Sequence, residues 1–203
     1  MENINFREYS SENTIKYRDV VSVQYDLQNV VRQLEQHLKL PKQKETEIIR
    51  LALWNSAIVT FMKCFASGVR QYKISSSIFE RLPGEPMRFY DFIKNLRDKH
   101  IAHSVSMCEE HLVGVVVNEG GLKSGIGHFS IIRVGEPDRT VQQVVMMAKL
   151  ALTEASDELK RLQKVIDEEL SQFDKADMLK WPILKYVVPD VEKAASKARK
   201  QTP

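Results

Sequence analysis

Apolar residues recur at intervals of three and four along most of this chain, and this spacing limits it to a mainly helical fold. In residues 15–39 the apolar positions are Val20, Val23, Leu27, Val30, Leu34 and Leu38. They share one face of a predicted helix, which Pro41 ends because proline has no backbone N–H to donate. The 203 residues include only 8 glycines and 7 prolines, so few positions interrupt such helices.

A second helix is predicted over residues 43–70. Its apolar residues fall on almost every face and are Ile48, Leu51, Trp54, Ile58, Phe61, Met62 and Phe65. A helix that is apolar all round is typical of the buried centre of a bundle. We therefore expect neighbouring elements to cover this helix on all sides, with Cys64 as a packing residue.

Two segments marked by proline follow the second helix. Ser77 and Glu80 have the spacing of a capping box, which predicts a short helical turn that Pro83 ends. Pro86 suits the first turn of a third long helix, because that position needs no backbone donor. We predict this third helix over residues 87–108.

The pattern changes after the third helix. Two short runs rich in β-branched residues, 111–117 and 128–134, predict the strands of a β-hairpin. Between them the sequence has several glycines, which predict a long, mobile loop. The fold class is therefore all-α, an antiparallel helical bundle with a β-hairpin inserted after the third helix.

A last long helix is predicted from a capping box at Thr140 and Gln143 to about residue 173. Two apolar rows repeat along it every seven residues: Val145, Leu152, Leu159, Ile166 and Phe173, with Ala148, Ala155 and Leu162 between them. Such a seam packs along another helix. That helix is either residues 15–39 of the same chain or its equivalent in a second copy.

The elements group into one helical domain, residues 15–188, between an N-terminal extension (1–14) and a basic C-terminal tail (189–203). A net charge of +3 permits an RNA partner without creating a strong field toward nucleic acid or membrane. The sequence has neither the apolar run of a spanning helix nor that of a signal peptide. We therefore expect a cytoplasmic protein with no membrane partner.

The densest polar cluster lies near the end of the third predicted helix. Arg97 and His103 stand six residues apart, which on a regular helix leaves them about 120° and about 9 Å apart. A long arginine and an imidazole at that separation can flank one phosphate, particularly if a second copy completes the site. Arginine stabilises charge that grows on phosphorus, and histidine transfers protons near neutral pH. RNA supplies its own nucleophile, the 2′-OH, so such a site needs no metal or other cofactor.

The segment from Arg97 to His103, RDKHIAH, resembles the R-x(4–6)-H motif of the HEPN superfamily, most closely the abortive-infection (Abi) type. The resemblance covers roughly residues 45–107. It implies a helical bundle of HEPN type and a metal-independent endoribonuclease, often a homodimer with a composite active site. It also implies a role as a toxin or in phage defence, with an antitoxin protein as a partner.

Carried over residue by residue, the resemblance makes Arg97 the phosphate and transition-state ligand and His103 the general base or acid. Asp98 is the polar residue that orients one of these two. Three neighbouring residues are expected to bind substrate: Lys99, His100 and Ser104.

Three other interpretations stay open. The two histidines continue the apolar stripe of the third helix, so they can be hydrogen-bonded core residues. Four residues offer zinc donors, although their spacing follows no common zinc motif: His100, His103, Cys108 and His111. The protein can also be a non-catalytic HEPN module in which the same motif holds a nucleotide or a protein partner. His37 and His128 are expected to be structural or surface residues.

Overall fold

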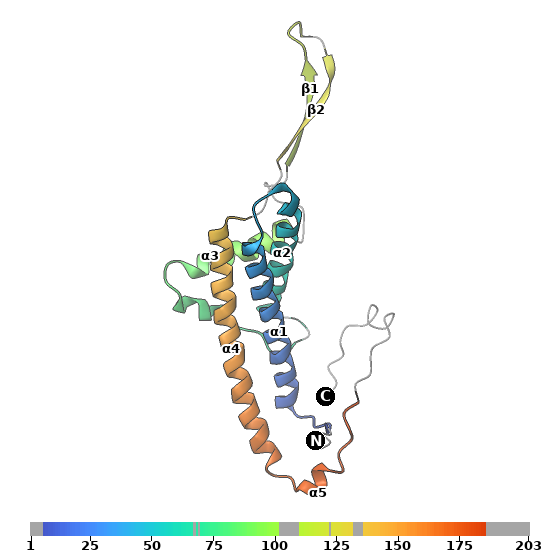
Figure 1. Cartoon of the computed structure of the whole chain (residues 1–203), viewed down its shortest axis with the longest axis vertical. Helices are drawn as coiled ribbons and strands as arrows, with labels where there is room; N and C mark the ends of the chain where they lie inside the picture. Colours follow the sequence, from blue (N-terminus) through green and yellow to red (C-terminus); the bar gives the residue numbers. More distant parts are fainter. Residues whose placement is uncertain are drawn as a thin grey trace. The chain divides into compact units, whose positions relative to one another are not determined.

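The computed structural model describes residues 6–66, 68, 70–101, 110–121, 123–131 and 136–185, with only the backbone at positions 100, 110, 111 and 131. Its elements are α1 (Glu12–Lys39), α2 (Lys44–Lys63), a 3₁₀ turn η1 (Ser76–Arg81), α3 (Pro86–Leu96), a π-helical turn η2 (Arg97–Ile101), β1 (Glu110–Val117), β2 (Lys123–Ile131), α4 (Asp138–Leu170) and α5 (Lys175–Met178). The chain is mostly helical with one two-stranded antiparallel sheet, as the sequence predicts (Figure 1). No helix within the described ranges has the length and apolar character that crossing a membrane requires.

Backbone contacts divide the chain into two units. The first comprises Met1–Tyr25, Ala66–Ile74 and Leu152–Pro203, and the second comprises Asp26–Phe65 and Ser75–Ala151. Helices α1 and α4 each contribute one half to each unit.

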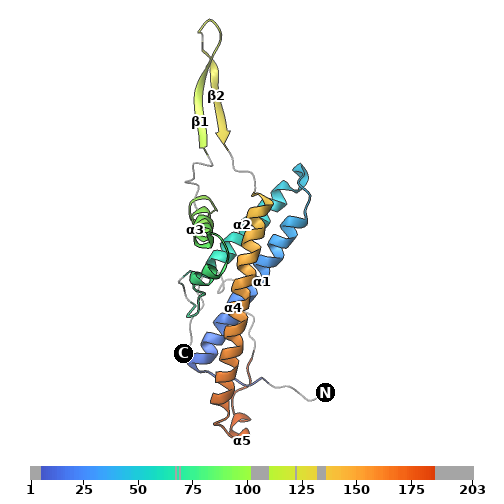
Figure 2. The ribbon, with the colours of Figure 1, turned by 90° about the vertical axis from the view of Figure 1, so that its left-hand side faces the viewer.

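Helices α1 and α4 run antiparallel and lie side by side in Figure 1, whereas in Figure 2, turned by 90°, α4 crosses in front of α1. Within the first unit they are joined by the Lys16–Glu158 ion pair of 2.8 Å. Within the second unit Lys149 pairs with Glu35 at 2.7 Å. The last helix therefore packs on residues 15–39 of the same chain, which is one of the two alternatives left open by the sequence.

The buried row of α4 differs from the prediction in part. Its fully buried residues are Val141, Val144, Ala148, Ala151, Ala155 and Leu162, so the predicted Ala148–Ala155–Leu162 row is correct. The residues of the other predicted row become more exposed toward the C-terminus, where Phe173 is 42% exposed. The buried alanines are small, which lets the two helices approach each other closely.

Helix α2 is not covered on all sides, so that prediction is wrong. Trp54, Ile58 and Phe61 are buried, whereas Ile48 is 74% exposed and Val59 44% exposed. The three buried residues are spaced by four and three, so they share one face of the helix. Ile48 and Val59 lie on the opposite face. The helix also ends at Lys63, seven residues earlier than predicted, where the N–H of the next residue bonds the carbonyl three residues back.

An aromatic cluster fills the second unit between α2, η1 and α3. The ring centroids of Phe65 and Phe79 lie 5.3 Å apart, and Tyr90 lies 5.5 Å from Phe65 and 5.6 Å from Phe79. Phe61 joins them at 4.9 Å from Phe65. Aromatic pairs at these distances stabilise beyond the area that they bury. The cluster fixes α3 against the end of α2.

In the first unit the start of the chain is held to the end of α4 and to the segment after α5. Glu169 accepts hydrogen bonds from Tyr9 at 3.2 Å, Ser11 at 3.0 Å and Asn13 at 2.5 Å. The Tyr9 ring stacks on Trp181 with 5.2 Å between centroids. The segment predicted as an N-terminal extension is therefore packed from Tyr9 on.

The β-hairpin is confirmed, but its loop is shorter than predicted. Strand β2 begins at Lys123, five residues before the predicted strand, so Gly125 and Gly127 lie within it. Its turn contains Gly121, whose φ of +77° suits glycine and whose N–H donates to the Asn118 carbonyl at 2.9 Å. The glycine-rich sequence predicts a loop, whereas part of it forms extended backbone.

Candidate functional site

Helix α3 carries the first half of the predicted motif to its position. It begins at Pro86, as predicted, and it buries Tyr90, Ile93 and Leu96. These three residues are spaced by three, so they share one face of the helix. The residue after Leu96 is Arg97, which begins the π-helical turn η2 that lies against α2.

The π turn changes the predicted geometry of the motif. In a π turn the backbone bonds span five residues instead of four, so the turn is wider than in an α-helix. The regular third helix, predicted to residue 108, therefore ends at Leu96. The angle of about 120° between Arg97 and His103 does not apply, because it assumed α-helical steps throughout. Isolated π turns occur frequently at functional sites.

Arg97 and Asp98 form an ion pair at the start of this turn. Nε of Arg97 lies 2.8 Å from Oδ1 of Asp98, and the two side chains are 30% and 42% exposed. The N–H of Nε does not point at that oxygen, so the contact is electrostatic without a hydrogen bond. Within the described part of the chain, no hydrogen bond is made by the two terminal nitrogens of Arg97. Among the described residues, the fork of the guanidinium therefore has no hydrogen-bond acceptor.

The charges of this pair act on a buried phenol nearby. Burial raises the pKa of Tyr90, the Asp91 carboxylate raises it further, Arg97 opposes this rise and Asp98 adds to it. Tyr90 itself is only 8% exposed and belongs to the aromatic cluster. The charges of the motif pair therefore act on a residue of the aromatic cluster.

The other predicted site residues are placed less fully. Lys99 is exposed on η2, and only the backbone of His100 is described. His103 and Ser104 lie outside the described residues, as does Cys108 of the zinc alternative. Of the predicted catalytic residues, the structure brings together Arg97 and Asp98. No cluster of three or more metal-binding side chains occurs among the residues that are described.

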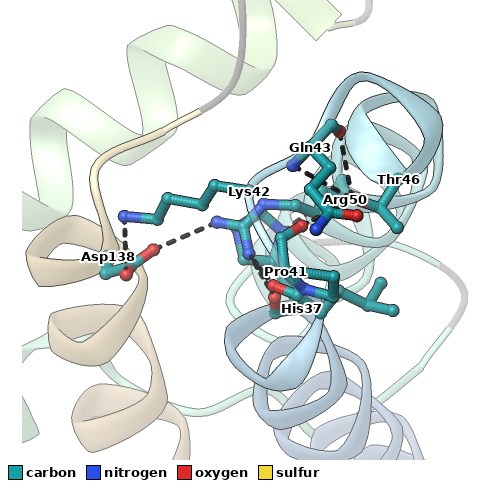
Figure 3. A network of polar contacts seen from close by, with 8 residues as sticks. His37, Pro41, Lys42, Gln43, Thr46, Arg50 and Asp138 are labelled. Carbon is teal, nitrogen blue, oxygen red and sulfur yellow. Dashed lines mark hydrogen bonds and ion pairs between the residues drawn. The ribbon is translucent and has the colours of Figure 1, made fainter.

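A second polar cluster, which the sequence analysis missed, joins the α1–α2 turn to the start of α4 (Figure 3). Arg50 on α2 donates from Nη1 to the carbonyls of His37 at 2.7 Å and Leu40 at 2.8 Å. Its Nη2 donates to Oδ1 of Asp138 at 3.0 Å. Lys42 pairs with the other oxygen of Asp138 at 2.8 Å. We call these residues the Arg50 cluster.

The Arg50 cluster fixes the state of His37, which is fully buried. Its Nδ1 lies 2.8 Å from the Arg50 carbonyl and must donate, because a carbonyl only accepts. Burial lowers the pKa of His37 most; the hydrogen bond to the Arg50 carbonyl and the charge of Asp138 oppose this, whereas the charges of Arg50 and Lys42 add to it, and the pKa is lowered overall. Above this lowered pKa the ring is neutral, and its Nε2 has no hydrogen-bond partner in the described chain. The expectation that His37 is structural agrees with this burial.

The charge of Asp138 follows from the same contacts. The Lys42 ammonium lowers the pKa of Asp138 most, and the Arg50 guanidinium lowers it as well. One sequence feature indicated this cluster: Arg50 is a charged residue at the start of the apolar stretch of α2. A charge at such a position is usually paired when it is buried.

A cavity of about 480 Å³ lies beside the Arg50 cluster. Its walls come from the end of α1, the first turns of α2 and the segment before α4, namely His37, Lys42, Gln43, Lys44, Glu47, Arg50, Glu136 and Pro137. Lys44 and Glu47 make no ion pair within the described residues. Among the described residues, Lys44 and Glu47 therefore give the cavity an ammonium and a carboxylate without an ion-pair partner, at the N-terminus of α2.

Comparisons of the chain with protein-family models, curated proteins and solved structures found no match.

Proposed function

We propose that this protein is a metal-independent endoribonuclease of HEPN type that acts as a homodimer. The observation that supports this best is the state of Arg97. Its Nε side faces Asp98, and its two terminal nitrogens donate no hydrogen bond to any described residue. A planar fork in this state matches the oxygens of a phosphodiester.

In this proposal the ribose 2′-OH attacks the adjacent phosphorus. The O2′–P bond forms, the P–O5′ bond breaks, and the products are a 2′,3′-cyclic phosphate and a free 5′-OH. His103 removes the proton from the 2′-OH, and the partner's His103 supplies one to the leaving 5′-oxygen. Arg97 stabilises the charge that grows on the phosphoryl oxygens. Asp98 positions the guanidinium from its Nε side. Lys99, His100 and Ser104 contact the RNA beside the cleaved bond.

The test is incubation of purified protein with mixed RNA in EDTA, followed by analysis of the new ends. We expect cleavage that leaves cyclic phosphates, with no cleavage of DNA of the same sequence. His103→Ala should abolish the cleavage at unchanged helicity. Cleavage that requires added metal, or that persists in His103→Ala, contradicts the proposal. A role as a toxin or in phage defence, restrained by an antitoxin protein, is part of the same proposal and rests on the motif alone.

The cavity beside the Arg50 cluster favours a second candidate function, the binding of a small anionic molecule such as a nucleotide. Its volume lies in the range of small-molecule sites. Lys44 and the first N–H groups of α2 can bind a phosphate, while Glu47 can accept from amino groups. This function uses residues other than the motif.

Calorimetric titration with AMP tests the second candidate. Lys44→Gln should weaken binding about tenfold, since it removes the unpaired ammonium. Lys164→Gln makes the same charge change on an exposed part of α4 and should have no effect. If both substitutions weaken AMP binding equally, the effect comes from the overall charge of the protein, which contradicts this candidate function.

A further inference from the structure

Another cavity of the second unit lies between helix α4 and the segment that leads into α3. Its volume is about 410 Å³, within the range of small-molecule sites. One wall belongs to the start of α4, and the other belongs to residues 82–86 and the first turn of α3. We call it the Arg139 cavity, after a cationic residue in its α4 wall. Most of its lining residues are apolar, namely Leu82, Pro83, Pro86, Phe89, Met146 and Met147.

The α4 wall of the Arg139 cavity has a polar end and an apolar end. Arg139, Gln143 and Met147 are spaced by four, so they share one face of the helix. At a rise of 1.5 Å per residue, the two methionines lie about 10–12 Å from Arg139 along the helix axis. Met147 is 1% exposed and belongs to the inner wall, whereas Met146 is 45% exposed and belongs to the rim. The wall therefore matches an elongated molecule with one polar end.

The polar end of the cavity carries one net positive charge. Arg139 is exposed and makes no ion pair or hydrogen bond with any described residue. Glu85 also lines the cavity, but its carboxylate pairs with Arg88 at 2.9 Å and so does not neutralise Arg139. The amide of Gln143 likewise has no hydrogen-bond partner in the described ranges. A guanidinium fork matches a carboxylate with two hydrogen bonds, and the amide can donate a third.

The apolar end suits a chain of methylene groups. Methionine side chains are unbranched and polarizable, so Met146 and Met147 adapt to the shape of what lies against them. On the facing wall, Pro83 and Pro86 fix the backbone, because the proline ring restricts φ. Apolar surface that lines a concave site favours an apolar ligand, since binding removes both surfaces from water.

We propose that the Arg139 cavity binds a medium-chain carboxylate, a small monoanion with an apolar body. The carboxylate lies against Arg139 and Gln143, and the chain extends along α4 toward Met146 and Met147. The single net charge of the cavity matches the single charge of this ligand. The cavity shares no lining residue with the cavity beside the Arg50 cluster and none with the motif. The proposal therefore holds whether or not the protein cuts RNA or binds AMP.

Three probes separate the carboxylate from the chain in calorimetric titrations at pH 7.5. Octanoate has both parts, acetate has the carboxylate alone, and octanol has the chain alone. The wild-type protein should bind one octanoate per chain, at least tenfold more tightly than either acetate or octanol. Octanoate that binds no more tightly than one of the other two, or that does not bind at about 1 mM, would overturn the proposal.

Arg139→Gln tests the polar end of the cavity. It should weaken octanoate binding at least tenfold and leave octanol binding unchanged, because only octanoate carries a charge. Arg32→Gln is the matched control, since Arg32 is an exposed arginine of α1 in the same unit without an ion pair among the described residues. Equal weakening by both substitutions would mean that octanoate responds to overall charge, which contradicts a site at Arg139.

Met146→Gln tests the apolar end with a side chain of similar length. It should weaken octanoate binding at least fivefold, because the chain then lies against an amide. Val59→Gln is the control, since Val59 on α2 is 44% exposed and Met146 is 45% exposed. Circular dichroism should give wild-type helicity for both variants. Octanoate binding that Met146→Gln leaves unchanged, or that Val59→Gln weakens as much, contradicts the placement of the chain.

Discussion

Arg50 and Arg97 lie in the same unit, and each is paired with an aspartate, yet their surroundings differ. The side chain of Arg50 is 10% exposed, and its terminal nitrogens donate three hydrogen bonds. The side chain of Arg97 is 30% exposed, and its terminal nitrogens donate none within the described chain. A buried arginine whose donors are used stabilises the fold, because an unmet buried donor or acceptor costs free energy. An arginine with open donors is free to bind a ligand.

The largest expected effect that separates the two arginines is on activity. Arg97→Ala should lower the rate of RNA cleavage about 10²–10³-fold, the usual result of removing one donor to a developing oxyanion. Its free energy of unfolding should change by less than about 1 kcal/mol, because the side chain is partly exposed. Single-turnover cleavage and urea unfolding measure these two quantities. Arg88→Ala, which removes an 83% exposed arginine on the preceding helix α3, is the control and should cleave normally.

The second-largest effect is expected on the free energy of unfolding when Arg50 is replaced. Arg50→Met should lower the free energy of unfolding by about 2–4 kcal/mol, because two carbonyls and a carboxylate lose their donor. Cleavage by the fraction that remains folded should be unchanged. Urea unfolding followed by circular dichroism gives the first value. If Arg50→Met proves as stable as the wild type, the contrast between the two arginines fails.

A smaller effect concerns pH and the histidine beside Arg50. The folded pKa of His37 lies below its unfolded value, so below about pH 6.5 the unfolded chain takes up a proton that the folded chain does not. Stability should therefore fall as pH decreases below 6.5, until the folded pKa is reached. The slope from one such group is at most about 1.4 kcal/mol per pH unit.

His37→Asn isolates this contribution. The asparagine amide can donate to the Arg50 carbonyl in place of Nδ1, but it does not titrate. Urea unfolding between pH 7 and pH 5 should show a shallower decline for the variant than for the wild type. Parallel curves would assign the decline to other groups.

The smallest effect is expected at the rim of the Arg50 cluster. Lys42 is 64% exposed, so its ion pair with Asp138 is weakened by solvent. Lys42→Gln should lower the free energy of unfolding by less than about 1 kcal/mol. A loss as large as that of Arg50→Met would mean that Lys42, and not Arg50, holds Asp138.

The elements that the sequence predicted well are those with one covered side. Apolar periodicity predicts α1 and α4, because the spacing of apolar residues shows which face is buried. Pro86 predicts the start of α3. The prediction that α2 is covered on all sides was wrong because an apolar side chain, such as that of Ile48 or Val59, does not show by itself that another element packs against it. The motif residues Arg97 and Asp98 were found from sequence, but their π turn was not. A wider turn depends on packing against α2 and aromatic residues distant in sequence.

Arg50 shows why the second polar cluster escaped prediction. Its partners are two main-chain carbonyls and one side chain 88 positions away. Backbone acceptors are the same at every position, so no residue type indicates them. Only the break in the apolar pattern of α2 hinted that this charge was buried.

The placement of the two tryptophans gives each unit its own fluorescent reporter. Trp54 is 2% exposed in the second unit, and Trp181 stacks on Tyr9 in the first. Replacing either one by phenylalanine leaves a single indole whose emission follows one unit alone. Coincident denaturation curves from the two variants would identify one cooperative molecule, and separated curves two independently melting halves. Intrinsic tryptophan fluorescence can therefore follow the unfolding of each unit separately, without an added label.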